Sequence, residues 1–330
     1  MTKVVARLLY LLAAGVGRLP WSWLLRIGDG IAASWRALDV RESRVVRRNL
    51  ELAFADLPFD QREHLHQRVL RTTARQALET VRMWTRPHAE NLALIRQTRG
   101  VELFDAAIAS GRGVVVAAPH YGNWELLNQW LAAHTSIAVL YSPPESAIGE
   151  AFLRIARADE ADRVQQIRAD GPAVRQLWKV LKNGGVVGIL PDQQPKLGDG
   201  EFAPFFGVQA LTMTLLNRLA ERTGATVLFA YCERMPAPGA LVEPQARDER
   251  GFAAPEFVLR FENAPAQIAS SDPVAGVVAL NAAVQRIASR DPAQYQWTYK
   301  RYSIPPSDGS RDGNPYWPDC YPARYRLEAG

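Results

Sequence analysis

Apolar and polar residues recur along the middle of the chain with two periods, one typical of strands and one typical of helices. Short runs rich in β-branched residues predict strands at 113–118, 137–141, 186–190 and 226–232, and an edge strand at 257–261. Apolar residues at helical spacing predict helices at 101–110, 123–134, 148–158, 172–182 and 211–222. Strands that alternate with helices predict an α/β fold, with a mostly parallel or mixed central sheet flanked by helices.

The N-terminal stretch, residues 4–25, is strongly apolar but is interrupted by Arg7, Arg18 and Pro20. The uninterrupted part, residues 8–17, is too short for a membrane span. A signal peptide is disfavoured, because no clean small-residue cleavage site follows and tryptophans continue the amphipathic pattern. We therefore predict a membrane-associated helix within residues 1–35, with its tryptophans at the level of the lipid headgroups. A buried helix of a soluble domain is the alternative interpretation.

The rest of the chain divides into a single domain at 36–305 and an irregular extension at 306–330, which is rich in Pro, Gly, Asp and Ser. Arginines are dense between residues 41 and 86, and apolar residues are interleaved at helical spacing. This pattern predicts amphipathic helices with a basic outer face, which is either solvated or in contact with anionic headgroups or an acidic partner. His64 and His66 lie in this polar stretch and are predicted to be surface residues.

Composition narrows the possible partners. The 330 residues are 48% hydrophobic, which is enough for a sizeable core, and the net charge of +5 favours nucleic acid, anionic lipid or an acidic carrier protein. No helix-turn-helix, zinc-ligand cluster or nucleic-acid module is apparent, so we expect no nucleic-acid partner. Cys232 and Cys320 lack metal-site spacing and do not suggest a disulfide framework.

The stretch from Pro119 to Glu125 carries the best candidate chemistry. If His120 and Glu125 lay in one helix, five residues at roughly 100° each would place them about 140° apart. Pro119 ends the preceding strand and Gly122 lets the chain bend, so His120 is predicted on a loop. Asn123 then serves as the N-cap of the next helix and Glu125 lies in its first turn. This arrangement lets the Glu125 carboxylate fold back towards the imidazole.

Such a pair is a general base with its orienting group. A carboxylate near a helix N-terminus is favoured in its ionised form, so Glu125 would hold one ring nitrogen of His120 protonated and stabilise the imidazolium. No Ser or Cys stands beside the pair as a nucleophile, so the attacking oxygen is expected to belong to a substrate. The alternative is a structural, hydrogen-bonding histidine. No nucleophile elbow, phosphate loop or dinucleotide fingerprint occurs elsewhere.

The segment His120-Tyr-Gly-Asn-Trp-Glu125 resembles the His-x4-Asp/Glu motif of glycerolipid-type acyltransferases. With its flanks, it is most similar to the late acyltransferases of lipid A biosynthesis, the lauroyl and myristoyl transferases of Gram-negative bacteria. The resemblance covers roughly residues 40–305. Other segments follow in the order that this family shows: Arg48-Asn49-Leu50, Asp192-Gln193, Phe202-Ala-Pro-Phe-Phe-Gly207 with Thr212, Leu219-Ala-Glu-Arg-Thr-Gly-Ala225 and Gln294-Tyr-Gln-Trp-Thr-Tyr-Lys-Arg301.

The resemblance implies a glycerolipid-acyltransferase-like fold and an acyl carrier protein as donor. It implies transfer of a fatty acyl group to a hydroxyl of a lipid A precursor, at the cytoplasmic face of the bacterial inner membrane, with an anionic membrane surface as partner. Neither a metal nor a bound organic cofactor is expected. Two alternatives stay open. One is acylation of another membrane lipid, such as a glycerophosphate, ornithine or aminolipid acceptor, and the other is a noncatalytic lipid-binding membrane protein.

The resemblance also adds residues for substrate binding or for stabilising an oxyanion. Asp192 and Gln193 follow the strand at 186–190 and are expected to position the acceptor, although an Asp in this place is commonly a turn former. The apolar Phe202, Phe205 and Phe206, with Gly207, are expected to wall an acyl-chain groove, with core packing as the alternative. Asn123 is expected to belong to this group of residues as well.

One departure from the family concerns its functional arginine. The family carries this arginine after the second strand, inside a short Arg-Gly-Arg cluster with a glycine a few residues on. This chain has Arg154-Ile-Ala-Arg157-Ala-Asp-Glu-Ala-Asp-Arg163 instead, with acidic residues in place of the glycine. Arg157 is the first choice for the functional arginine, and Arg154 and Arg163 are the alternatives.

Overall fold

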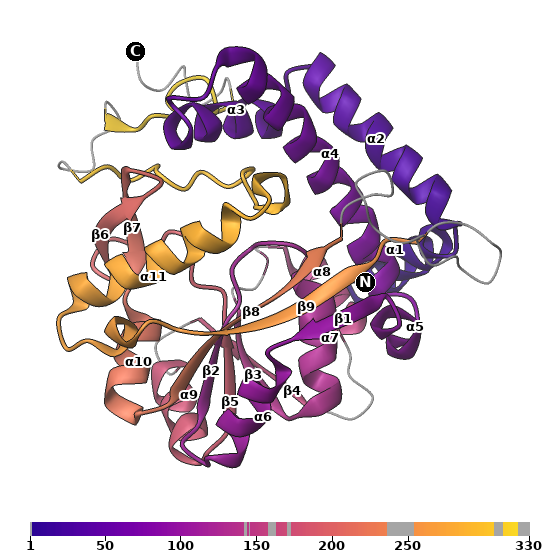
Figure 1. The fold of residues 1–330 in the computed structure, drawn as a ribbon. Helices are drawn as coiled ribbons and strands as arrows, with labels where there is room; N and C mark the ends of the chain where they lie inside the picture. The colour runs from indigo at the N-terminus through magenta and orange to yellow at the C-terminus, as the bar shows by residue number, and fades with distance from the viewer. Residues whose placement is uncertain are drawn as a thin grey trace. The chain divides into compact units, whose positions relative to one another are not determined.

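In the computed structural model of the chain, the described residues are 2–141, 144, 146–157, 163–169, 173–235, 254–306 and 313–322 (Figure 1). They form two compact units that are interleaved along the sequence. Unit 1 comprises the residues up to Gly28, Arg75–Leu190 and Arg222–Asn263, and unit 2 comprises Asp29–Ala74, Pro191–Glu221 and the residues from Ala264 onward. The predicted boundaries at residues 35 and 305 stay a prediction.

A mixed sheet forms the centre of unit 1. Its order over the described residues is β1-β9-β8-β2-β5-β3-β4. The strands are β1 (Ile95–Arg99), β2 (Val114–Ala117), β3 (Ile137–Tyr141), β4 (Val164–Arg168), β5 (Val186–Ile189), β8 (Thr226–Arg234) and β9 (Phe257–Asn263). The five strands from β8 to β4 are parallel, whereas β9 runs antiparallel to β8 and parallel to β1. The α/β class with a mostly parallel, mixed sheet is confirmed.

The edges of this sheet differ from the prediction. β9 was predicted as an edge strand, but it lies between β1 and β8. The two strands at the edges, β1 and β4, were not predicted. Their sequences, Ile-Arg-Gln-Thr-Arg and Val-Gln-Gln-Ile-Arg, are largely polar and exposed. An edge strand bonds to a neighbour on one side only and tolerates polar side chains, so its apolar signal is weak.

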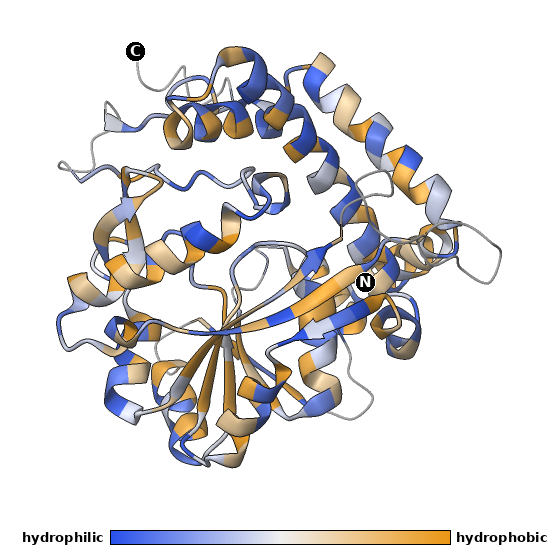
Figure 2. Ribbon diagram, in the orientation of Figure 1, coloured by the Kyte–Doolittle hydropathy of each residue, from blue (hydrophilic) through white to orange (hydrophobic). Residues whose placement is uncertain are grey.

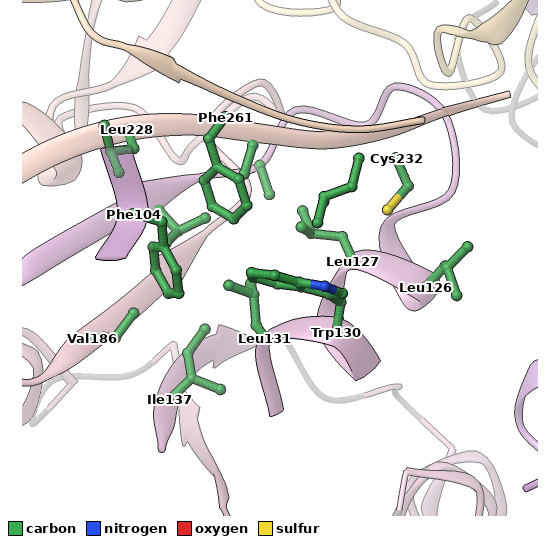
Figure 3. Packing of buried hydrophobic residues seen from close by; sticks show 14 of the residues in the cluster. Phe104, Leu126, Leu127, Trp130, Leu131, Ile137, Val186, Leu228, Cys232 and Phe261 are labelled. Carbon is green, nitrogen blue, oxygen red and sulfur yellow. The ribbon is translucent and has the colours of Figure 1, made fainter. Parts of the chain in front are cut away.

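The core of unit 1 explains the central strands. All four residues of β2 are buried, as expected for a strand covered on both faces, and the central strands are strongly hydrophobic (Figure 2). α6 (Val101–Ala109) and α7 (Trp124–His134) cover one face. The Phe104 ring stacks on Phe261 at 4.9 Å and lies 5.8 Å from Trp130 (Figure 3). α9 (Ala173–Lys182) contacts β3, β4 and β5 and buries Leu177 and Leu181.

The N-terminal helix α1 (Thr2–Gly17) packs on α8 (Ala147–Ala156), and its buried residues are the small Ala6, Ala14 and Gly17, of which Gly17 lies against Arg82 and Thr85. Its larger apolar side chains are exposed: Val4, Val5, Leu8, Leu9, Leu11, Leu12 and Val16. Among the described helices, none is by itself long and apolar enough to cross a membrane. Only together are α1 and α2 (Trp21–Ala37) long and apolar enough to span a membrane, and the pair is bent by 110° at the break between them. The membrane association predicted for this segment is therefore not confirmed by the fold.

Unit 2 contains a helical part and a small antiparallel hairpin. Its elements include α3 (Arg41–Ala53), β6 (Gly200–Phe205), β7 (Val208–Met213), η1 (Ala266–Ala269), α11 (Pro273–Ala288) and η2 (Pro292–Gln294). α4 (Phe59–Met83) and α10 (Leu215–Thr223) contribute residues to both units, and α5 (His88–Leu92) belongs to unit 1. The helix predicted at 211–222 begins only at Leu215, because Leu211–Met213 pair with β6 instead.

The segment Gln294–Arg301 and the C-terminal extension hold unit 2 together. Arg301 is buried and donates to the Leu211 carbonyl at 2.6 Å and to the Thr212 hydroxyl at 2.5 Å. The Asn49 amide donates to the Trp297 carbonyl at 2.6 Å and accepts from the Tyr316 hydroxyl at 2.5 Å. The extension is therefore fixed to its unit by a buried tyrosine, in agreement with its irregular but aromatic sequence.

His66 corrects one expectation. It was predicted at the surface, but it is 1% exposed. Its Nε2 lies 3.2 Å from the Ser43 hydroxyl, and its Nδ1 lies 3.4 Å from a Glu63 carboxylate oxygen. It falls on the same face of α4 as the buried Val69 and Leu70, so the apolar stripe of the helix decides its position.

Burial of His66 predicts a pH-dependent stability. Burial lowers the pKa of the His66 imidazole from its ordinary value near 6.5. Below pH 6.5 the unfolded chain then binds more protons at this histidine than the folded chain does. The free energy of unfolding is therefore fully retained above that pH and decreases as the pH falls. We expect His66→Gln to reduce the fall in unfolding free energy between pH 7 and 5, measured by urea titration. His64→Gln, at an exposed position of the same helix, is expected to keep the wild-type slope.

Candidate active site

His120 lies at the carboxyl edge of the parallel strands. β2 pairs with β5 on one side and β8 on the other, and the ladder to β5 continues with a bond of 2.9 Å from the Ala118 amide to the Ile189 carbonyl. The strands that follow β2 in the chain therefore lie on both sides of it, which makes this edge a topological switch point. Open α/β sheets bind their ligands at such points, outside the carboxyl ends of the strands.

The turn after His120 is held against β8 and α4. Gly122 has φ +64°, and a Cβ atom at this position would collide with the Cys232 carbonyl oxygen. The Asn123 amide donates to the same carbonyl at 2.8 Å, and the Gln76 side chain donates to the Gly122 carbonyl at 2.7 Å. Only glycine allows this close approach of two backbones.

A second set of contacts fixes the residue next to His120. The buried Tyr121 donates its hydroxyl proton to a carboxylate oxygen of Glu233 at 2.7 Å. The other oxygen of Glu233 accepts from the Arg260 guanidinium at 2.8 Å. His120 is thus flanked by residues that β8 and β9 hold in place.

Helix α7 begins as predicted. Asn123 is its N-cap, and the side-chain oxygen accepts from the Leu126 amide at 3.0 Å. Glu125 lies in the first turn, where the helix dipole favours a carboxylate. The His120 imidazole is 9% exposed and packs edge-on against the Trp124 ring at 5.3 Å. The predicted turn at Gly122 and the predicted N-cap at Asn123 are therefore confirmed.

The Glu125 carboxylate pairs with Arg157. The Glu125 side chain is only 3% exposed, so its charge depends on this partner. In the described part of the chain Glu125 makes no hydrogen bond to His120, which is the contact that the sequence led us to expect. Arg157 also lies 5.8 Å from the Trp84 ring, and its Nε is buried without a hydrogen-bond partner among the described residues.

The three candidate arginines occupy different environments. Arg154 has a side chain 78% exposed and pairs with Glu150 at 3.5 Å. Arg163 donates to the Ala133 carbonyl at 2.9 Å, near the end of α7. Arg157 is the one of the three that contacts the His120–Glu125 segment.

Two charged residues near the turn were missed by the sequence reasoning. Glu79 of α4 is 1% exposed, pairs with Arg234 of β8, and accepts from the Asn123 side-chain amide at 3.3 Å. Burial and the nearby Arg75 lower the pKa of Arg234 to about 9. Gln76, Glu79 and Met83 are spaced along one face of α4, and this spacing could have pointed to Glu79. It becomes informative only when the segment that packs on this face is known.

The site contains no thiolate and no evident metal-ligand group in the described residues. No three His, Cys, Asp or Glu side chains gather there in a way that could hold a metal ion. Cys232 is fully buried among apolar side chains, and burial raises the pKa of its thiol. Its thiol is therefore protonated and belongs to the core.

The remaining predicted site residues, Asp192, Gln193, Phe206 and Gly207, belong to unit 2, whereas His120, Asn123, Glu125 and Arg157 belong to unit 1. Asp192 is 4% exposed and forms a hydrogen bond with the side chain of Tyr295, whose pKa is raised by burial and by that carboxylate.

Phe206 and Gly207 form the turn of the β6–β7 hairpin, with φ of +50° and +76°. The Phe206 ring packs 5.2 Å from both Phe54 and Trp297. These are the contacts of core residues. The acyl-groove role of Phe206 and Gly207 and the acceptor-positioning role of Asp192 and Gln193 stay predictions.

Comparison with known proteins points to one family over nearly the whole chain. The family described as bacterial lipid A biosynthesis acyltransferase matches residues 2–303. A lipid A biosynthesis palmitoleoyltransferase of Escherichia coli K12 is 25% identical over 296 residues, which is 88% of each chain. A lipid A biosynthesis lauroyltransferase of the same organism is 24% identical over 292 residues, 88% of this chain and 89% of its own. A phosphatidylinositol mannoside acyltransferase of Mycobacterium tuberculosis is 27% identical over 143 residues, 42% of this chain and 44% of its own.

Proposed function

Because the chain belongs to the family of bacterial lipid A biosynthesis acyltransferases, we propose that it transfers a fatty acyl group to a hydroxyl of a lipid A precursor. The donor in this proposal is an acyl thioester of acyl carrier protein. The observation that carries the proposal is the family match over residues 2–303, which includes the His120–Glu125 segment. The relatives named for lipid A acylation cover 88% of the chain, so the likeness is not confined to the motif.

His120 is proposed as the general base. Its imidazole takes the proton of the acceptor hydroxyl, and the oxygen attacks the thioester carbonyl to give a tetrahedral intermediate. Collapse of this intermediate forms the ester and breaks the carbon–sulfur bond. The imidazolium then returns its proton to the sulfur of the carrier. The rigid turn around Gly122 supports this role, since a base must be held within hydrogen-bond reach of its proton.

Glu125 and Arg157 are proposed to supply the charges of the reaction. The carboxylate of Glu125 stabilises the imidazolium, as the motif implies, and holds Arg157 beside the turn. The buried Nε of Arg157, which has no hydrogen-bond partner among the described residues, is a donor for the oxyanion of the intermediate. Both groups then act on charge that develops only during the reaction.

The acceptor is tested with the purified full chain and one acyl carrier protein thioester. We expect an ester product with a lipid A precursor and little or none with phosphatidylinositol mannoside, a glycerophosphate or an ornithine lipid. The products are identified by mass spectrometry, and acyl-coenzyme A replaces the carrier thioester in a parallel set. Preference for another acceptor, or equal use of acyl-coenzyme A, would contradict the corresponding part of the proposal.

A second candidate is acylation of a different membrane lipid by the same residues. The partial likeness to a phosphatidylinositol mannoside acyltransferase favours it, because that relative is named for a glycolipid outside lipid A. The same acceptor panel separates the two functions. A chain that retains lipid but releases no thiol from the donor would instead support a noncatalytic lipid-binding protein.

We also propose that α1 rests on the anionic cytoplasmic face of the bacterial inner membrane. Its exposed face carries large aliphatic side chains, and Lys3 and Arg7 add positive charge beside them. Such a helix lies in the interface with its apolar face among the acyl chains. This placement would bring a membrane-bound acceptor to the enzyme.

The double variant Leu8→Glu/Leu12→Glu is expected to weaken binding to anionic lipid vesicles by at least about tenfold. Two leucines of this exposure, 56% and 69%, are each worth about 1–2 kcal/mol when they enter lipid, and the new charges repel the surface. Vesicle co-sedimentation measures the effect. Val274→Glu/Val278→Glu, at exposed positions of α11, is the matched control. Equal binding of the two double variants would contradict the proposed orientation.

A further inference from the structure

We infer that Glu79 is a positioning residue for the reaction. With Arg234, it holds the side-chain amide of Asn123 and through it the turn that carries His120 and Glu125. The inference rests on the proposed function, because it assigns a role in acyl transfer to a residue outside the motif.

Glu79 binds two different side chains with its two carboxylate oxygens. One carboxylate oxygen pairs with Arg234, and the other accepts from the Asn123 Nδ2 at 3.3 Å. A carboxylate only accepts hydrogen bonds, so it selects the NH2 end of the amide. The oxygen end of Asn123 is then left to accept from the Leu126 amide at 3.0 Å. Glu79 therefore decides which way the capping amide points.

The buried charge of Glu79 is balanced by Arg234. A carboxylate that is 1% exposed is costly unless it is paired, and Arg234 supplies the partner from the carboxyl end of β8. The pKa of Arg234, lowered to about 9, still leaves the guanidinium charged at neutral pH. Because β8 pairs directly with β2, the ion pair ties α4 to the strand next to the one that delivers His120.

Asn123 links the Glu79–Arg234 pair to the turn and to the start of α7. It stands between His120 and Glu125, and its backbone amide is already bound to the Cys232 carbonyl. A rotation of its side chain would move the start of α7, and Glu125 with it. A displacement of about 1 Å at a reacting group can cost up to about a hundredfold in rate. The expected signature is a loss in kcat with little change in KM.

The test reverses the hydrogen bond. Asn123→Asp keeps a capping oxygen for Leu126, but places a second carboxylate oxygen against Glu79. We expect kcat for transfer from the acyl carrier thioester to fall at least about tenfold, with KM for both substrates within about twofold of wild type. Adding Glu79→Gln supplies an NH2 donor towards the new carboxylate and keeps one negative charge beside Arg234. This double variant is expected to recover kcat to within about threefold of wild type.

The outcomes separate the inference from the proposed function. Glu90→Gln, the same change in the exposed Arg86–Glu90 pair, is the matched control and should leave kcat unaltered. A fully active Asn123→Asp chain would overturn the inference. So would a double variant that regains the wild-type melting temperature but not the lost kcat, because the hydrogen bond would then be only structural. A wild-type chain with no transfer to any acceptor would instead overturn the proposed function.

Discussion

Replacing His120 by alanine is expected to lower kcat for acyl transfer by about a thousandfold. A positioned general base contributes about 10²–10⁴ to the rate, and among the described residues of the turn His120 is the one histidine. The measurement is the release of carrier thiol in the presence of a saturating acceptor. His120 is 9% exposed and packs on Trp124, so its replacement can also affect stability. The melting temperature of the variant is therefore measured with the rate, to separate a loss of catalysis from a loss of folding.

His64→Ala is the control for this prediction, because His64 is an exposed histidine on α4. It should keep both the rate and the melting temperature of wild type. A His120→Ala chain that transfers acyl groups at a rate within about threefold of wild type would remove His120 from the mechanism. The family membership would stand, and the base would have to be sought elsewhere.

Arg157→Leu is expected to reduce both stability and rate. The Glu125 carboxylate would be left without a counter-charge at 3% exposure, and breaking a buried pair in this way costs about 3 kcal/mol. The rate should fall by about a hundredfold because the proposed oxyanion donor is removed. Urea unfolding gives the first effect, and kcat with the carrier thioester gives the second.

A double variant separates the two effects. Glu125→Gln with Arg157→Leu leaves no unpaired charge, so we expect most of the lost stability to return while the rate stays low. Arg154→Leu is the control, since that arginine is exposed and should change the unfolding free energy by less than about 0.5 kcal/mol. If Arg154→Leu slowed transfer and Arg157→Leu did not, the choice among the three arginines would be wrong.

The sequence predicts the local part of this site well. Pro119, Gly122 and Asn123 are each strong signals for a strand end, a turn and an N-cap, and each acts on its immediate neighbours. The strand at β2, the turn and the start of α7 are therefore found where the pattern places them. Local signals of this kind need no knowledge of the rest of the fold.

The partners of these residues could not be predicted in the same way. Glu79 lies 44 residues before Asn123, and Arg157 lies 32 residues after Glu125. Such pairings depend on which helices and strands meet, and hydrophobic periodicity does not specify that. The β6–β7 hairpin was not predicted for a related reason. The short segment Leu211-Thr212-Met213 suits a strand or a helix start equally well, and the pairing with β6 decides it.

The inverted arrangement of α1, with small residues inward and large aliphatic ones outward, has a practical consequence for handling the protein. In buffer without detergent, the exposed aliphatic side chains of this helix favour aggregation between copies of the chain, even when each copy is correctly folded. A low yield of protein in such a buffer would then reflect this exposed surface and not misfolding, and a mild surfactant should restore the yield.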